Sequence, residues 1–142
     1  MKAKNWRRQV VACLLAALVS PMLGVGLAKA SAVDGTWIIR GLVVDIFDCQ
    51  LLVCGQIVWI KDVSRRASQC GKTIIWGLEA KGPTEDWGGG SILDPNNGKT
   101  YRLSATYEQD GTLRARIFKG IPLLGRTEIL TRVDVRSLTG QC

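Results

Sequence analysis

The chain contains no histidine among its 142 residues, and this absence excludes several common kinds of site. Histidine is the usual general base, the usual partner of a serine nucleophile and a frequent zinc ligand. Adjacent carboxylates such as Glu85 and Asp86 remain for acid–base work, but neighbouring residues of a strand point to opposite faces. We therefore predict no catalytic residues, no metal site and no cofactor, and a protein that is not an enzyme.

A long uncharged run begins close to the N-terminus. Basic residues precede it, residues 10–27 carry no charge, and the small-residue pattern Ala28-Lys29-Ala30 follows. This order is typical of a secretory signal peptide. We predict a cleavable helical Sec-type signal peptide over residues 1–30, cut near residues 30–32, and a periplasmic or secreted domain over residues 33–142. An uncleaved anchor is the alternative, because the run is close to the length that spans a bilayer.

The positive charge of the chain belongs mostly to this N-terminal segment. The sequence holds 19 lysine and arginine residues against 12 aspartate and glutamate residues, which gives a net charge of +7. Five basic residues and no acidic residue lie in residues 1–30, so the predicted domain has a net charge of only +2. We therefore expect no nucleic-acid partner, and contact with a membrane only through the transient signal peptide.

Four cysteines follow the predicted signal peptide: Cys49, Cys54, Cys70 and Cys142. An even number in a small exported domain indicates disulfides. Three pairings are open, and we favour Cys49–Cys54 with Cys70–Cys142. The first pair brackets a four-residue connection between two strand-like runs, and the second would tie the C-terminal tail to the rest of the domain.

The predicted domain consists of short β-type runs separated by turn residues, without helical periodicity. Residues 101–107 alternate between Tyr, Leu and Ala on one face and Arg, Ser and Thr on the other, and residues 113–117 alternate in the same way. Such alternation indicates strands with one buried face and one solvated face. About eight strands with short connections predict an all-β antiparallel meander that closes as an up-and-down barrel. A β-sandwich is the alternative.

Glycine and turn residues mark particular points of this pattern. Asp94-Pro95-Asn96-Asn97-Gly98 predicts a turn in which Asp94 accepts hydrogen bonds from backbone N–H groups, and its single carboxylate is too little for calcium. Gly88-Gly89-Gly90 interrupts a strand, which predicts a bulge or a close backbone approach.

Several motifs of the domain together resemble the DUF2147 family, a bacterial exported domain of unknown function. The match runs in order over nearly the whole domain, through Gly35-x-Trp37, Cys49-x4-Cys54-Gly55-x-Ile57-Val58-Trp59, Gln69-Cys70-Gly71, Trp87-x-Gly89-Gly90, Asp94-Pro95-x-x-Gly98-Lys99-x-Tyr101, Leu113-x-x-Arg116, Leu124-Gly125-Arg126-Thr127 and Arg132. The resemblance implies a calycin-like eight-stranded barrel, similar to lipocalins and fatty-acid-binding proteins. It implies no particular activity.

Two residues of the resemblance suit a structural role. Lipocalins also carry Gly-x-Trp at the first strand and an arginine in the last strand, where the tryptophan plugs one end of the barrel and the arginine packs over its ring. Trp37 and Arg132 are the matching residues here. We expect this pair to join the first strand to the last.

The interior of such a barrel is the expected place for a ligand, since eight strands enclose just enough space for one small molecule. We expect the protein to bind a small apolar or amphipathic molecule, with Arg116 meeting a carboxylate. The alternative is a structural or protein-interaction module of the bacterial cell envelope with a fully packed core. Neither the ligand nor the oligomeric state follows from the sequence. The aromatic candidates for the lining are Phe47, Trp59, Trp76, Tyr101 and Tyr107.

Overall fold

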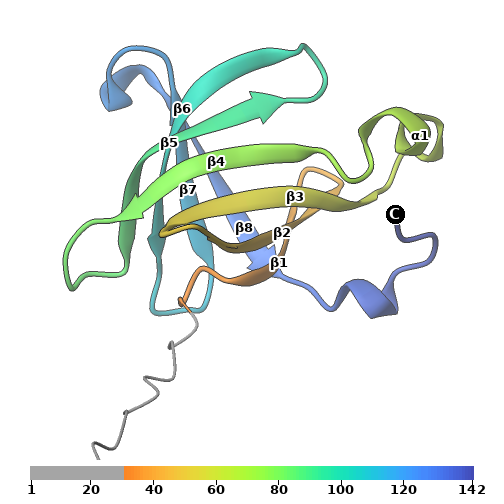
Figure 1. The fold of residues 1–142 in the computed structure, drawn as a ribbon, viewed down its shortest axis with the longest axis horizontal. Helices are drawn as coiled ribbons and strands as arrows, with labels where there is room; N and C mark the ends of the chain where they lie inside the picture. The colour runs from red at the N-terminus through yellow and green to blue at the C-terminus, as the bar shows by residue number, and fades with distance from the viewer. Residues whose placement is uncertain (1–30) are drawn as a thin grey trace, which may run out of the picture.

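Eight antiparallel strands close into a barrel in the computed structural model, which describes residues 31–142 (Figure 1). Each strand pairs with the next along the chain, and β1 pairs with β8 through Trp37 opposite Arg132 and Ile38 opposite Thr131. This closure confirms the up-and-down barrel and excludes the sandwich. The predicted signal peptide and its cleavage site lie outside the described residues. The strands are β1 (Gly35–Ile39), β2 (Leu42–Cys49), β3 (Leu52–Ile60), β4 (Thr73–Ala80), β5 (Asp86–Asp94), β6 (Lys99–Tyr107), β7 (Leu113–Phe118) and β8 (Arg126–Arg132).

The helical pieces are short and lie in connections or in the C-terminal tail. No helix among residues 31–142 is long and apolar enough to cross a membrane. The β3–β4 connection is the longest and carries two of the pieces. They are η1 (Val63–Arg65), α1 (Arg66–Gln69), η2 (Pro122–Leu124) and η3 (Val135–Ser137).

The alternation expected for β6 and β7 is present. Leu103, Ala105, Leu113 and Ala115 are buried in the barrel, whereas Arg114 is exposed. Among residues 31–142, all the buried side chains of the barrel core are hydrophobic. Burial of this apolar surface is the main favourable contribution to folding.

Register shifts interrupt the pairing of β2 with β3, of β3 with β4 and of β5 with β6. In β5 the register shifts between Trp87 and Gly90, and Gly89 has φ +73°, as the run of three glycines predicted. Gly90 also makes a close approach, because a Cβ there would lie 2.6 Å from Leu78 Cγ. In β3 the register shifts so that Val58 is an extra residue, and Trp59 pairs with Val43 on the outer face.

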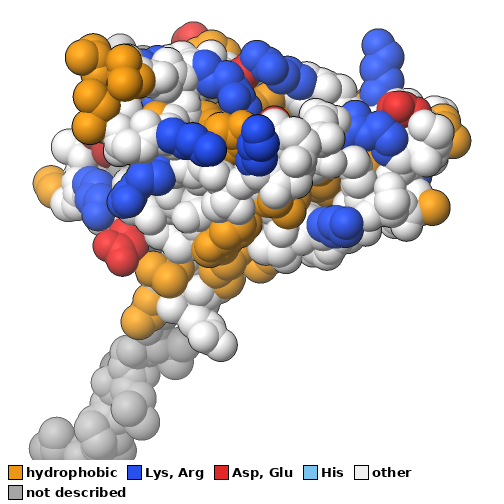
Figure 2. Space-filling model, turned by 90° about the horizontal axis from the view of Figure 1, so that it is seen from above, with side chains coloured by type: hydrophobic (Ala, Val, Ile, Leu, Met, Phe, Trp, Pro, Cys, Tyr) orange, Lys and Arg blue, Asp and Glu red, His pale blue; other side chains and the backbone are white. Residues whose placement is uncertain are grey.

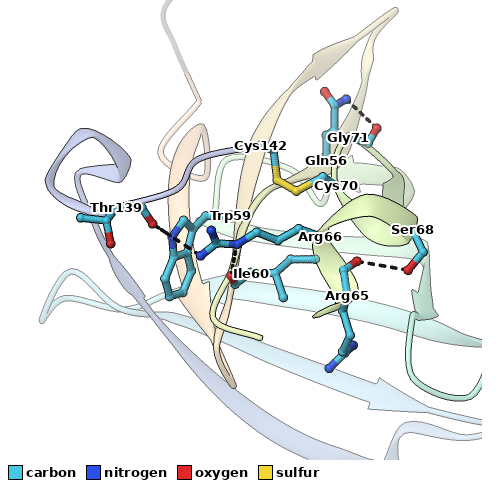
Figure 3. Close-up of a disulfide and its surroundings, with 10 residues drawn as sticks. All are labelled: Gln56, Trp59, Ile60, Arg65, Arg66, Ser68, Cys70, Gly71, Thr139 and Cys142. Atoms are coloured by element: carbon cyan, nitrogen blue, oxygen red, sulfur yellow. Dashed lines mark hydrogen bonds between the residues drawn. A yellow bond between two sulfur atoms is a disulfide. The ribbon is translucent and has the colours of Figure 1, made fainter. Parts of the chain in front are cut away.

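The C-terminal tail is fixed to the outside of the barrel by a disulfide and by hydrogen bonds (Figure 3). Cys142 is bonded to Cys70, and its N–H donates to the carbonyl of Val58 at 3.0 Å. Trp59 Nε1 donates to the Thr139 carbonyl at 2.8 Å. Val43, the register partner of Trp59, is fully buried although it lies outside the barrel core.

The second disulfide joins Cys49 to Cys54 across the β2–β3 turn, so both pairs are the ones favoured from the sequence. At the tip of this turn Gln50 and Leu51 adopt φ of 55° and 71°. Such left-handed conformations are uncommon for residues other than glycine. The disulfide bridges the strands on either side of these two residues.

The two disulfides should differ in their effect on stability. Cys70 and Cys142 are 72 residues apart, whereas Cys49 and Cys54 are 5 apart. A longer loop restricts the unfolded chain more, so the Cys70→Ser/Cys142→Ser variant should lose about 4 kcal/mol of unfolding free energy, against about 2 kcal/mol for Cys49→Ser/Cys54→Ser. Urea unfolding of both variants measures this. A larger loss in the second variant would contradict the loop-length argument.

Candidate functional site

The barrel encloses a cavity of about 100 Å³ that reaches one end of the molecule. This open end is formed by the β1–β2, β3–β4, β5–β6 and β7–β8 connections. Tyr101 and the charged side chains of Arg40, Arg65, Arg126 and Glu128 lie along the wall toward this end. The deeper wall is aliphatic, with side chains that include Leu42, Val44, Ile74, Leu103, Ile117 and Leu130.

The volume limits what the cavity can hold. Pockets for drug-sized ligands are usually about 300–1,000 Å³, whereas an apolar cavity of about 150 Å³ is enough for benzene. A space of about 100 Å³ therefore suits a short alkyl segment or a similarly compact apolar group. The rest of the interior is filled by the protein's own side chains.

A charged cluster lies at the mouth of the cavity. The carboxylate of Glu128, whose side chain is only 11% exposed, lies between two arginines. Arg40 Nη2 is 2.5 Å and Arg126 Nε is 3.3 Å from Glu128 Oε1. Arg126 also lies 3.8 Å from a carboxylate oxygen of Asp94, and its guanidinium is 5.3 Å from the centre of the Tyr101 ring. These residues orient one another, and their positive and negative charges balance.

Arg65 adds a positive charge that this cluster does not neutralise. It ends η1 and lines the cavity, and its side chain points away from Trp59 and the C-terminal disulfide (Figure 3). Its Nη2 donates to Gln69 Oε1 at 2.8 Å, and Gln69 Nε2 donates to the Pro95 carbonyl at 2.9 Å. Among residues 31–142 no acidic side chain forms an ion pair with Arg65. Its remaining N–H donors are therefore free for an anion.

The turn between β5 and β6 gives Arg65 this support. Asp94 Oδ1 accepts a hydrogen bond from the Asn96 N–H at 2.9 Å, as expected from the sequence. Gly98 has φ +67°, and its N–H donates to the Asp94 carbonyl. The turn holds the Pro95 carbonyl toward Gln69, and this residue in turn holds Arg65.

The opposite end of the barrel is closed by Trp37 and Arg132. Trp37 is fully buried, and its Nε1 donates to the Val33 carbonyl at 2.8 Å. The guanidinium of Arg132 lies 4.2 Å from the centre of the Trp37 ring and donates to the carbonyls of Asp34 and Ala32. A Cβ at Gly35 would lie 2.7 Å from Arg132 Nη1, which explains the glycine of the Gly-x-Trp motif.

The family model described as "Uncharacterized protein conserved in bacteria (DUF2147)" matches residues 35–132. This chain belongs to the DUF2147 family. Among solved structures, the barrel is similar to one described as "Protein HP1028 from the human pathogen Helicobacter pylori belongs to the lipocalin family", with a TM-score of 0.59 and 14% sequence identity. The likeness covers 73% of this chain and 84% of that chain, and it shows the fold alone. No curated protein matches the chain.

The DUF2147 barrel places only one of the predicted aromatic residues in the cavity wall, which is Tyr101. Tyr107 packs at the closed end, edge-on to Trp37 with ring centres 6.2 Å apart. Trp59 lies on the outer face because the Val58 bulge reverses the alternation of β3. Trp76 is 39% exposed and pairs with Ser91. Tyr107, Trp59 and Trp76, expected from the sequence to line the interior, therefore lie outside the cavity wall.

Phe47 and Arg116, also expected to face the interior, lie outside the cavity wall as well. Phe47 lies on the outer face of β2, because its neighbour Ile46 points into the cavity. Arg116 alternates with the inward residues Ala115 and Ile117 and therefore points outward. Its guanidinium donates to the carbonyls of Pro122 and Leu123 and to Thr127 Oγ1, at 2.8, 3.0 and 2.9 Å. It thus holds the β7–β8 connection.

Arg65 was not among the site residues predicted from the sequence. It is followed by a second arginine, Arg66, and the two side chains point in different directions. Arg66 Nε donates to the Ile60 carbonyl at 2.9 Å, and its guanidinium lies 5.9 Å from the centre of the Trp59 ring. The local sequence does not distinguish Arg65 from Arg66, because the direction of each side chain depends on how the β3–β4 connection lies against the rest of the barrel.

Removal of the Arg132 side chain should destabilise the DUF2147 barrel. Arg132→Ala loses the contact with Trp37 and two hydrogen bonds to the N-terminal segment, and we expect a loss of about 2 kcal/mol of unfolding free energy. Urea unfolding measures it. Arg136→Ala is the matched control, because Arg136 is 85% exposed and contacts only Asp134. Equal losses for the two variants would contradict the role of Arg132.

Asp34 should make stability depend on pH. Burial raises the pKa of Asp34 above its ordinary value of 3.8, and its Oδ1 has no hydrogen-bond partner. The folded state therefore holds this proton more tightly than the unfolded chain, so stability is lost as pH rises above about 4. The advantage of the Asp34→Asn variant over the wild type should grow between about pH 4 and pH 7. A difference independent of pH in thermal unfolding would refute this.

Proposed function

We propose that this DUF2147 protein is an exported carrier or sensor of a small amphipathic anion, which it binds without turnover. The alkyl part of the ligand would lie among the aliphatic side chains of the cavity, and its carboxylate would lie at Arg65. The observation that supports this proposal is an arginine without an ion-pair partner, among the described residues, at the mouth of an apolar cavity. Guanidinium and carboxylate groups form strong charge-assisted hydrogen bonds.

Two features support export. Both disulfides join cysteines that follow the predicted signal peptide, and disulfides persist mainly in oxidising compartments such as the periplasm. The N-terminal sequence has the composition of a signal peptide. We therefore place the working protein in the bacterial envelope or outside the cell.

Ligand binding is testable with a series of straight-chain fatty acids. Calorimetric titration with butanoate, pentanoate and hexanoate, whose alkyl parts suit the small cavity, should show saturable binding, and Arg65→Gln should weaken it about tenfold or more, because a hydrogen bond to a charged group contributes about 1.5–3 kcal/mol. Arg136→Gln is the control, since Arg136 is an exposed arginine of the C-terminal tail that does not line the cavity. Hexanol should bind the wild type and Arg65→Gln equally, because it lacks the carboxylate.

A second variant tests the cavity rather than the charge. Ala115 lines the cavity, and Ala115→Leu would fill part of it. We expect this variant to lose binding of the short fatty acids and of hexanol alike, with folding checked by circular dichroism. The proposal fails if no fatty acid binds the wild type and native mass spectrometry finds no small molecule on protein from its own host.

The small cavity also favours a second candidate function. A volume of about 100 Å³ leaves the interior close to fully packed, as expected for a structural or protein-interaction module of the cell envelope. In that case Ala115→Leu would raise or preserve stability and change no binding. The titrations above therefore separate the two functions.

A further inference from the structure

The β7–β8 connection carries a group of large apolar side chains in solvent. Ile121, Leu123 and Leu124 have exposed fractions of 54%, 81% and 78%. Figure 2 shows hydrophobic side chains standing out from the surface at the position of this connection. Single exposed leucines are ordinary, but a contiguous apolar group marks an interaction surface.

This connection is held in place by Arg116. The Arg116 guanidinium binds the carbonyls of Pro122 and Leu123, and η2 begins with Pro122. Gly125 then brings the chain so close to β7 that a Cβ there would lie 2.6 Å from the Ile117 carbonyl oxygen. The apolar side chains therefore project from an ordered connection. The hydrogen bonds that hold this connection are made by backbone carbonyls, so they do not explain why the apolar side chains are exposed.

The charges of the barrel are distributed unequally between its two ends. The four connections of the open end contain six lysine or arginine residues and one acid, Asp62, and the mouth residues Arg126, Asp94 and Glu128 of the adjoining strands bring this to seven cations against three acids. The three connections of the closed end contain one lysine and three acids. Lys119 lies two residues before Ile121, and Arg126 lies two residues after Leu124. The apolar connection thus belongs to the cationic end. The six cations are Arg40, Lys61, Arg65, Arg66, Lys72 and Lys119.

We propose that the open end of the barrel docks on an anionic phospholipid bilayer, with Ile121, Leu123 and Leu124 inserted among the headgroups. Apolar side chains flanked by cations, at a cationic end of the molecule, are what a surface of this kind attracts. The sequence alone predicted membrane contact only through the signal peptide, and this surface adds a second contact made by the folded domain. It also turns the cavity mouth toward the lipid. Docking needs no ligand in the cavity, so it stands apart from the proposed function.

The test is flotation of the processed protein, its N-terminus identified by mass, with vesicles of defined composition. We expect binding to vesicles of equal parts phosphatidylcholine and phosphatidylglycerol, and little binding to phosphatidylcholine alone. Leu123→Ser/Leu124→Ser should reduce the partition coefficient by about tenfold or more, because each leucine that inserts transfers an apolar side chain out of water. Lys119→Gln should reduce it by about fivefold.

The closed end supplies matched controls for both changes. Leu51 is a fully exposed leucine of the β2–β3 turn, and Lys81 is the lysine of the β4–β5 connection. Leu51→Ser and Lys81→Gln should leave the partition coefficient unchanged. All four variants alter exposed side chains, so equal melting temperatures would show that they remain folded.

Three results would overturn the proposal. One is the absence of binding to anionic vesicles, and another is an equal loss in the open-end variants and their closed-end controls. A third is a dimer of the wild type that Leu123→Ser/Leu124→Ser converts to monomer without any vesicle binding, since the apolar group would then be a contact between two copies. Fatty-acid titration of the same samples shows whether the ligand site is intact when docking fails.

Discussion

The pairing of the first strand with the last is the constraint on which the rest of this molecule depends. Arg132 lies over Trp37 and also binds the backbone that leads into β1, so a single side chain joins residues about one hundred positions apart in the sequence. Without that closure the sheet would have two free edges and no enclosed interior. Because such distant partners must meet before the core is complete, we expect the barrel to fold slowly for its size.

The sequence predicted the strands well and the cavity wall poorly, and the reasons are physical. Alternation in β6 and β7 follows directly from burial of one face, so the barrel could be inferred from residues such as Leu103 and Ala115. A single bulge at Val58 reverses that rule for Trp59, and nothing in the local sequence marks it. Arg116 was misplaced because aromatic and charged residues were assigned by type, without their strand parity.

The interior of the barrel is apolar, and the charged groups of the candidate site lie at its rim. The interior is aliphatic and nearly filled, so it favours shape and length over polar recognition. The rim holds Glu128 between two arginines and leaves Arg65 with donors to spare. The arrangement of these charged groups depends on long-range contacts between connections, and a family match over residues 35–132 supplies the barrel and no ligand.

The opposed charges of the two barrel ends have a consequence for motion before any contact is made. A positive end and a negative end give the barrel a dipole along its length, although residues 31–142 have a net charge of only +2. Near an anionic surface such a dipole would experience a torque, which falls off over a distance of about 8–10 Å at physiological salt. Toward such a surface the barrel would turn while it diffuses, with its cavity mouth foremost.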